Sequence, residues 1–395
     1  MKIKYSDKRG LFGFLKRDSR SGLILLTLLV APLISNAQYA LKKEKEFHVD
    51  SLYPVELVDY HPGEGLYLGY LEMKSKDVEV CLVNGEGEIV VEKKLAGEGP
   101  EQYTASLNCL AFSDDGEVLL QTPFEVLRYD RDLKLKERLR FQASVQMYLS
   151  GNLRPFAYFF KNSSPSVFSF FTIPTGASRY LVPGDFRTSN LLEIYDLKDK
   201  KTYEILPVSE RPLYKKLDKS VGALYFPVYT VDRHQSRLYA TASMDNEITV
   251  VDLNTNKTLS RIPINHGEFN SLKNSVISQG SLPSYKHITL AGRNHKMYKL
   301  DNDLIALEYI REIPFGTYEK QIADDPNYHH FQDPSYHRLI LFDEKKQISS
   351  DLLVPANGKI KTTLPGARFL VKIDNPDVEE DFVRYGIFEL LRQGQ

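Results

Sequence analysis

The sequence lacks tryptophan and has only two cysteines in 395 residues. It also lacks the short signatures of common enzyme classes: G-x-S-x-G, H-E-x-x-H, the Walker A loop and C-x-x-C. No catalytic residue can therefore be named, and no cofactor is predicted. Cys81 and Cys109 both lie in apolar runs, so we expect two buried free thiols, although an oxidising compartment would also permit a disulfide.

Long hydrophobic runs are equally scarce, and the one at the N-terminus, LILLTLLVAPLI (residues 23–34), follows a basic segment. Small residues precede Gln38, which is the pattern of a secretory signal peptide cleaved between Ala37 and Gln38. The run is short for a membrane span, so no span is expected in the mature chain. The sequence thus predicts a signal peptide over 1–37 and a single domain over 38–395, exported to the periplasm or the cell exterior.

The exported part has no basic run and a mildly acidic balance, because residues 1–37 remove seven Lys and Arg but only two Asp and Glu. Such a chain is a poor nucleic-acid binder. No cysteine lies near the cleavage site, so a lipoprotein is not predicted. We expect a monomer.

Helical periodicity is almost absent after Gln38, and short apolar or alternating runs recur between polar turns. One unit repeats: a strand ending near an acid or amide, a tight turn and a second strand. Five copies each contain one marker residue at the end of the first strand: Asn84, Asp130, Asp196, Asp252 and Asp343. A sixth half-copy contains Glu389. Further hairpins are expected in LNCLAFSDDGEVLLQT (residues 107–122), YFPVYTVDRHQSRLYATAS (225–243) and YKHITLAGRNHKMYKL (285–300).

This repeat predicts an all-β propeller with six four-stranded blades. The longest gap, between Asp252 and Asp343, could hold a seventh blade built on LIALEYIREI, but ADDPNYHHFQDPSYH (residues 323–337) favours an insertion in the form of an extended loop. The last half-copy, FVRYGIFELL, has no second strand after it. We therefore expect residues 41–49 to pair antiparallel with YGIFELL and close the ring.

The stretch LAGEGPEQYT (residues 95–104) could be a phosphate loop or a turn between blades. Pro100 removes a backbone donor, and Glu98 and Glu101 would repel an anion. We interpret it as the passage from the outer strand of one blade to the inner strand of the next, with Gly97 and Gly99 supplying backbone freedom.

A family resemblance rests on Gly97, Gly99, Pro100 and Tyr103, on Tyr285 and its hairpin, and on the segments LILFDE and YGIFEL. Through these features the chain resembles the exported six-bladed propellers of unknown function that are abundant in Bacteroidetes, which are similar in shape to TolB-like and NHL-like propellers. The resemblance covers roughly residues 40 to 391 and implies a fold, not an activity. Glu101 and Gln102 replace the Gly-Glu pair that usual members carry, which puts any role of that pair in doubt.

Three groups are candidate sites. His329, His330, Asp333 and His337 are weak metal candidates, because neighbouring histidines of an extended chain point apart and no metal is predicted. The acidic run from Asp374 to Asp381 lacks the spacing of a calcium loop and is interpreted as a solvated loop. The aromatic segment 155–171 could form a stacking surface for sugars or peptides, but we favour blade core.

The function expected is therefore binding or scaffolding, with recognition of an envelope protein, peptide or glycan. The alternative is a hydrolase or lyase acting on a glycan or peptide from the propeller funnel, and an enzyme is the less favoured of the two. Asp50-Ser51-Leu52 resembles the acceptor motif for O-glycosylation in exported Bacteroidetes proteins, with Ser51 as the acceptor.

Overall fold

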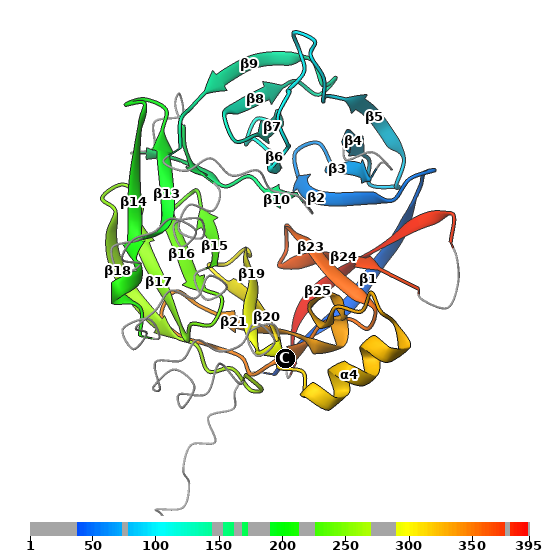
Figure 1. Cartoon of the computed structure of the whole chain (residues 1–395), viewed down its shortest axis with the longest axis vertical. Coiled ribbons are helices and arrows are strands. Elements are labelled where there is room, and N and C mark those ends of the chain that lie inside the picture. The colour runs from blue at the N-terminus through cyan, green and yellow to red at the C-terminus, as the bar shows by residue number, and fades with distance from the viewer. Residues whose placement is uncertain are drawn as a thin grey trace, which may run out of the picture. The chain divides into compact units, whose positions relative to one another are not determined.

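The computed structural model describes residues 38–72, 78–143, 153–161, 168–172, 190–212, 226–269, 290–375 and 380–393. All of them belong to the compact unit Ala37–Gln395. This unit is a ring of six antiparallel sheets, as expected from the repeat (Figure 1). Among its described residues no helix is long and apolar enough to cross a membrane.

Blades 1 to 3 follow the chain from the first inner strand onward. Blade 1 consists, from the middle of the ring outward, of β2 (Val55–His61), β3 (Leu66–Glu72), β4 (Val78–Val83) and β5 (Ile89–Lys94). Blade 2 consists of β6 (Cys109–Phe112), β7 (Val118–Gln121), β8 (Glu125–Tyr129) and β9 (Leu135–Arg140), with β10 (Arg154–Pro155) added in parallel on the inner side of β6. Blade 3 consists of β11 (Tyr158–Phe160), β12 (Phe168–Thr172), β13 (Asn190–Asp196) and β14 (Lys201–Pro207), followed by the 3-10 turn η4 (Val208–Glu210).

Blades 4 to 6 complete the ring. Blade 4 consists of β15 (Pro227–Asp232), β16 (Arg237–Ala242), β17 (Glu247–Asp252) and β18 (Lys257–Pro263). Blade 5 consists of β19 (Arg293–Lys299), β20 (Ile305–Ile310), β21 (His337–Phe342) and β22 (Leu352–Leu353). Blade 6 consists of β23 (Gly358–Leu364), β24 (Arg368–Ile373), β25 (Phe382–Gln393) and, as its outer strand, β1 (Gln38–Asp50).

The ring closes by the predicted pairing of the chain ends. β1 runs antiparallel to β25, with Phe47 opposite Tyr385 and Leu41 opposite Leu390. Phe47 stacks on Tyr385 at 5.6 Å and on Tyr67 of blade 1 at 5.2 Å between ring centroids. β1, the first described strand, thus fills the edge that the last repeat leaves open.

The repeat markers are turn residues. The side-chain oxygens of Asn84, Asp130, Asp196, Asp252 and Asp343 accept hydrogen bonds from backbone N–H groups of the turn that follows each third strand. An Asx side chain fixes a tight turn in this way, which explains the spacing of the markers. Glu389 was a wrong choice of sixth marker, because it lies within β25 opposite Lys42 and Arg368.

Six apolar clusters fill the six interfaces between neighbouring blades. The aromatic segment 155–171 contributes Phe156, Tyr158, Phe159, Phe168, Phe170 and Phe171 to two of them, so for its described part the interpretation as core is confirmed. Residues 162–167 of that segment lie outside the described part. Cys81 and Cys109 are buried free thiols, as expected.

Blade 5 corrects two predictions. LIALEYIREI supplies β20 of this blade and no seventh blade, as favoured, but the insertion after it is not extended: it contains the helix α4 (Phe315–Asp324) and the 3-10 turns η7 (His330–Gln332) and η8 (Pro334–Tyr336). The hairpin expected in 285–300 is also wrong for its second half. Arg293 to Lys299 form one strand that pairs forward with β20, and residues 285–289, including Tyr285, lie outside the description.

Candidate functional site on the inner strands

Strand direction divides the ring into two ends. Each inner strand begins at one end, and because the strands of a blade alternate in direction, the connections between second and third strands and those between blades all leave from that same end. We call it the loop rim. The insertion with α4, between β20 and β21, belongs to it, as does LAGEGPEQYT, which leads from β5 to β6 as predicted.

Within that passage, glycine is required at Gly97, where φ is +154° and a Cβ atom would clash with the amide of Gln102. The backbone N–H of Gly99 donates to the same amide oxygen at 2.9 Å. The turn interpretation is therefore consistent with the local geometry, and Gln102, which replaces a residue of the usual motif, fills the inside of the turn.

Three inner strands carry a β-bulge near the loop rim. The register shifts between Leu57 and Asp59 in β2, between Asn294 and Lys296 in β19, and between Ile360 and Thr362 in β23. The extra residues in the last two are His295 and Lys361. A bulge re-aims neighbouring side chains, which allows His295 and Lys296, adjacent in sequence, both to approach Glu308 on β20.

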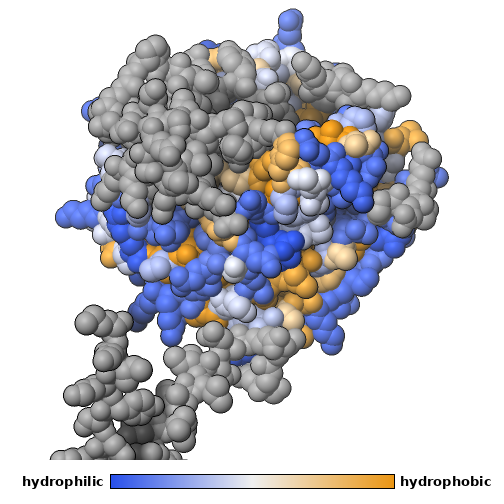
Figure 2. Space-filling model, turned by 60° about the horizontal axis from the view of Figure 1, so that its bottom comes forward, coloured by the Kyte–Doolittle hydropathy of each residue, from blue (hydrophilic) through white to orange (hydrophobic). Residues whose placement is uncertain are grey.

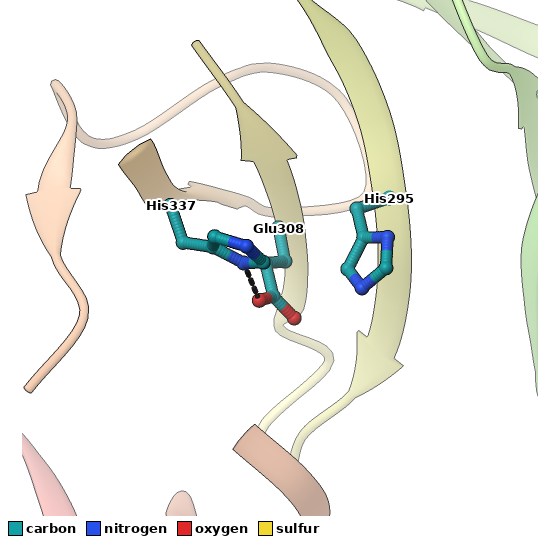
Figure 3. Close-up of side chains that lie close together, drawn as sticks. All are labelled: His295, Glu308 and His337. Atoms are coloured by element: carbon teal, nitrogen blue, oxygen red, sulfur yellow. Dashed lines mark hydrogen bonds and ion pairs between the residues drawn. The ribbon is translucent and has the colours of Figure 1, made fainter. Parts of the chain in front are cut away.

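His295, Glu308 and His337 come together from three adjacent strands of blade 5 (Figure 3). One potential ligand atom of each lies within 4.8 Å of those of the others. His337 Nδ1 is 2.6 Å from Glu308 Oε1, and His337 Nε2 is 3.0 Å from the carbonyl oxygen of Phe331 in η7. The Tyr298 hydroxyl donates to Glu308 Oε2 at 2.6 Å.

These contacts occupy both carboxylate oxygens of Glu308 with hydrogen bonds, and both nitrogens of His337 face oxygen atoms. Burial disfavours the charged form of Glu308, but the hydrogen bond and charge of His337 outweigh it and hold the pKa of that carboxyl well below its usual range. Burial lowers the pKa of His295 to about 3, so this half-buried imidazole is uncharged at neutral pH.

Two histidines and a carboxylate are a ligand set that zinc uses, and a histidine bonded to a carbonyl through its second nitrogen is typical of a ligand. Here, however, Glu308 and His337 already share a proton at 2.6 Å, too close for both atoms to surround one ion. Lys296 adds positive charge beside them. The arrangement fits a buried ion pair better than a metal centre.

The predicted metal candidates are dispersed by the insertion. His330 is fully buried and packs edge-on against Tyr318 and Tyr336, whereas His329 is exposed and stacks on Phe331. Asp333 caps η8 by accepting from the N–H of Ser335 and also accepts from the Tyr328 hydroxyl. Of the four, only His337 joins the cluster with Glu308.

A second buried acid, Glu56 of β2, lies between two cations of blade 6. Lys361 contacts one of its oxygens and Lys372 the other. Burial again opposes ionisation, and the two ammonium groups outweigh it, so the pKa of Glu56 is lowered. Like Glu308, this carboxylate has no free oxygen for a reaction.

Two further cations, Arg154 and Lys296, lie near these acids without forming an ion pair with a described residue. Lys296 Nζ reaches only the carbonyl oxygen of Ile360, at 3.4 Å, and the Arg154 guanidinium lies 4.6 Å above the ring of Phe226. Within the described part of the chain neither forms an ion pair. Burial is the main cause that lowers the pKa of Lys296. The charges of Glu308 and Glu56 oppose this shift, and those of Lys361 and Arg154 add to it.

Arg154 lies on the innermost strand. β10 runs inside β6, and the Arg154 charge acts on Cys109 of β6, Tyr229 of β15 and Lys296 of β19. These strands belong to three different blades, so Arg154 lies in the middle of the ring. We call Arg154, Lys296 and His295 the axial cluster.

Sequence reasoning missed the whole axial cluster. It placed His295 and Lys296 within the hairpin expected over residues 285–300, and no motif marks Arg154. One signal was available: Glu56 and Glu308 are acids inside the apolar runs YPVELV and LIALEYI, and a buried acid requires partners.

The other predicted sites lie on the surface or outside the description. Ser51 follows β1, and its hydroxyl accepts from the N–H of Tyr53 at 3.3 Å, while Leu52 is 96% exposed. Of the cleavage pair, Ala37 lies outside the described residues and Gln38 begins β1. In the acidic run, Asp374 pairs with Lys359, and Asp377 and Glu379 are not described.

Exposed apolar residues do not gather on one face. The large ones in the described part lie on four separate elements and in the turn after β1: Leu52, Val90, Leu259, Phe315 and Leu353. On the face drawn in Figure 2, apolar residues (orange) are interspersed with hydrophilic ones (blue). Exposed apolar residues therefore do not mark a binding site in the described part of the chain, and the unpaired charges of the axial cluster are the clearer sign of one.

Comparison with known proteins supports the fold. A member of the DUF4221 family from Bacteroides vulgatus has a TM-score of 0.64 at 12% identity, covering 90% of this chain and 99% of its own. A protein of Bacteroides fragilis named for its expected export covers 91% and 96% at 11% identity, with a TM-score of 0.49. No family model matches the sequence, and no curated protein matches it.

The first of these structures shows a fold, not a function, at this identity. The resemblance to exported propellers from Bacteroidetes is thus supported for the fold, because a structural neighbour from Bacteroides shares it. The TolB-like and NHL-like part of the resemblance stays a prediction.

Proposed function

We propose that the chain is an exported binding propeller that recognises its partner at the loop rim through the axial cluster, and that it is not a hydrolase or lyase. One observation carries the proposal. Near the axis, the carboxylates Glu56 and Glu308 are engaged on both oxygens, whereas the cations Arg154 and Lys296 form no ion pair in the described part of the chain.

The engaged acids weigh against the enzyme alternative. Glycoside hydrolysis uses a pair of carboxyl groups of which one protonates the leaving group and the other acts as nucleophile or activates water. Glu308 is 2% exposed and Glu56 8%, and each would have to give up a hydrogen-bonded partner first. Unpaired cations need no such rearrangement to hold an anionic group.

A single experiment separates the two functions. Purified protein is incubated with arrayed envelope glycans and peptides, and bound protein and cleavage products are measured on the same spots. Binding without cleavage that weakens in Arg154→Gln/Lys296→Gln, but not in the control Arg140→Gln/Lys257→Gln, supports the proposal. Product release, or binding that ignores both variants, contradicts it. The control residues are exposed cations on the outer strands β9 and β18.

Export and modification belong to the same proposal. We expect the mature protein to begin at Gln38 and to act as a monomer outside the cytoplasm, with Ser51 glycosylated at the loop rim. Leu52 beside it is 96% exposed, so an enzyme could reach this turn. Mass spectrometry of the native protein tests both. An intact mass equal to that of the bare polypeptide refutes glycosylation, and peptides from residues 1–30 in a digest refute cleavage.

A further inference from the structure

The chemistry of the axial cluster narrows the ligand class. Its cations are of two kinds. Arg154 offers a planar fork that matches the two oxygens of a carboxylate, and Lys296 offers a compact charge. Both are half-buried, which strengthens an ion pair relative to one on the open surface.

His295 contributes a different group. Its imidazole is uncharged at neutral pH and half-buried, and no hydrogen bond links it to the described residues. A neutral imidazole has one donor and one acceptor, which matches a hydroxyl group rather than a carboxylate. The bulge in β19 places this ring beside Lys296, so a hydroxyl and a negative charge would be bound close together.

The backbone of β10 excludes another mode of recognition. The N–H groups of Arg154 and Phe156 donate to Asn108 and Leu110 of the neighbouring chain segment at 3.2 Å each, and Pro155 between them has no N–H. The free edge of this strand therefore lacks a donor, and an extended peptide could not add to it as a further strand. Recognition has to come from side chains.

We propose that the axial cluster binds a hydroxycarboxylate, namely the uronic acid unit of an acidic glycan. Arg154 and Lys296 hold the carboxylate, and His295 bonds a neighbouring hydroxyl. This rests on the proposed binding function and names its ligand. It also fits a chain without tryptophan, because charge and hydrogen bonds replace the stacking that binds neutral sugars.

The test is isothermal titration calorimetry with three probes: trigalacturonate, its neutral counterpart trigalactose, and triglutamate. Trigalacturonate should bind, at least about tenfold more tightly than either other probe, and more weakly as salt rises. Arg154→Gln/Lys296→Gln should weaken its binding at least about tenfold, while Arg140→Gln/Lys257→Gln leaves it unchanged. The charge-preserving Arg154→Lys/Lys296→Arg should recover part of the affinity.

His295→Ala gives a readout that loss of structure would not imitate. It should weaken trigalacturonate but not cyclohexanecarboxylate, which has the charge without the hydroxyl. Thermal melts identify variants that fail to fold. If Arg154→Gln/Lys296→Gln fails to fold, the charge-preserving Arg154→Lys/Lys296→Arg is compared with the unsubstituted protein instead.

Three results would overturn the inference: no binding of trigalacturonate, equal binding of triglutamate, or binding unaffected by loss of both cations. If the protein still binds a neutral glycan or a peptide on the array, the binding function stands and only the ligand class falls. If it binds nothing on the array, both fall.

Discussion

The seam that closes the ring and the cluster beside its axis are both rich in charged residues, but the charges do different things. In the seam, Lys43, Glu46 and Arg384 pair at the surface, while Phe47 and Val49 are buried. Near the axis, Glu56, Glu308 and His337 are themselves buried. Surface pairs of this kind contribute about 0–1 kcal/mol, whereas breaking a buried pair costs about 3–5 kcal/mol. Apolar contacts and backbone pairing thus stabilise the seam, whereas buried ion pairs stabilise the strands around Glu56 and Glu308.

The largest expected effect comes from removing the seam. Deleting residues 41–49 while keeping residues 1–40 exposes the edge of β25 and the face that Phe47 covers. Each lost backbone hydrogen bond contributes about 1 kcal/mol, so the loss is comparable with a typical stability of about 5–15 kcal/mol. Thermal denaturation should show a much lower Tm and aggregation. An unchanged Tm would mean that the pairing does not hold the ring.

Glu308→Gln should be the most damaging charge substitution. It removes the buried carboxylate charge that the His337 ring and the Tyr298 hydroxyl contact, and we expect the free energy of unfolding to fall by about 3–5 kcal/mol. Urea denaturation measures it. A cost below about 1 kcal/mol would show that the buried pair of Glu308 and His337 behaves like a surface pair, which removes the distinction between the two regions.

Acid should act on the buried histidines before it acts on the seam. Burial lowers the pKa of His266 and His330 to about 4 and of His295 to about 3, from 6.5. The unfolded chain binds protons near pH 6.5 and the folded one does not, so stability is lost as the pH falls from 6.5 toward 4. His295→Asn should reduce the loss between pH 7 and pH 5 by about 1–2 kcal/mol. An identical pH profile in this variant would contradict the buried, neutral state of His295.

The smallest effect is expected in the seam charges. Glu46→Gln removes the partner of Lys43 and Arg384, both on the surface, and should change the free energy of unfolding by less than about 1 kcal/mol. The change should shrink further in high salt. A loss as large as that of Glu308→Gln would show that exposed charges, rather than Phe47, hold the seam.

The same contrast explains what could be predicted from the sequence. Alternation in residues 41–49 and the Asx residues at each turn are local patterns, and they specify six blades and their closure. The axial cluster depends on bulges at His295 and Lys361 and on a strand, β10, that returns inside its own blade. Neither the bulges nor β10 produces a periodic pattern in the sequence, because contacts between blades determine where they form. For the same reason α4 was missed: it is the one α-helix among the described residues of a β protein, and it has no buried residue.

The most direct measurement is a crystal structure of the protein grown with trigalacturonate. We predict a carboxylate with its oxygens within about 3 Å of Arg154 and Lys296 and a hydroxyl within the same distance of a His295 nitrogen. Ligand bound on an outer strand or on the rim formed by the short turns, with Arg154 and Lys296 untouched, would contradict the assignment of the axial cluster as the binding site.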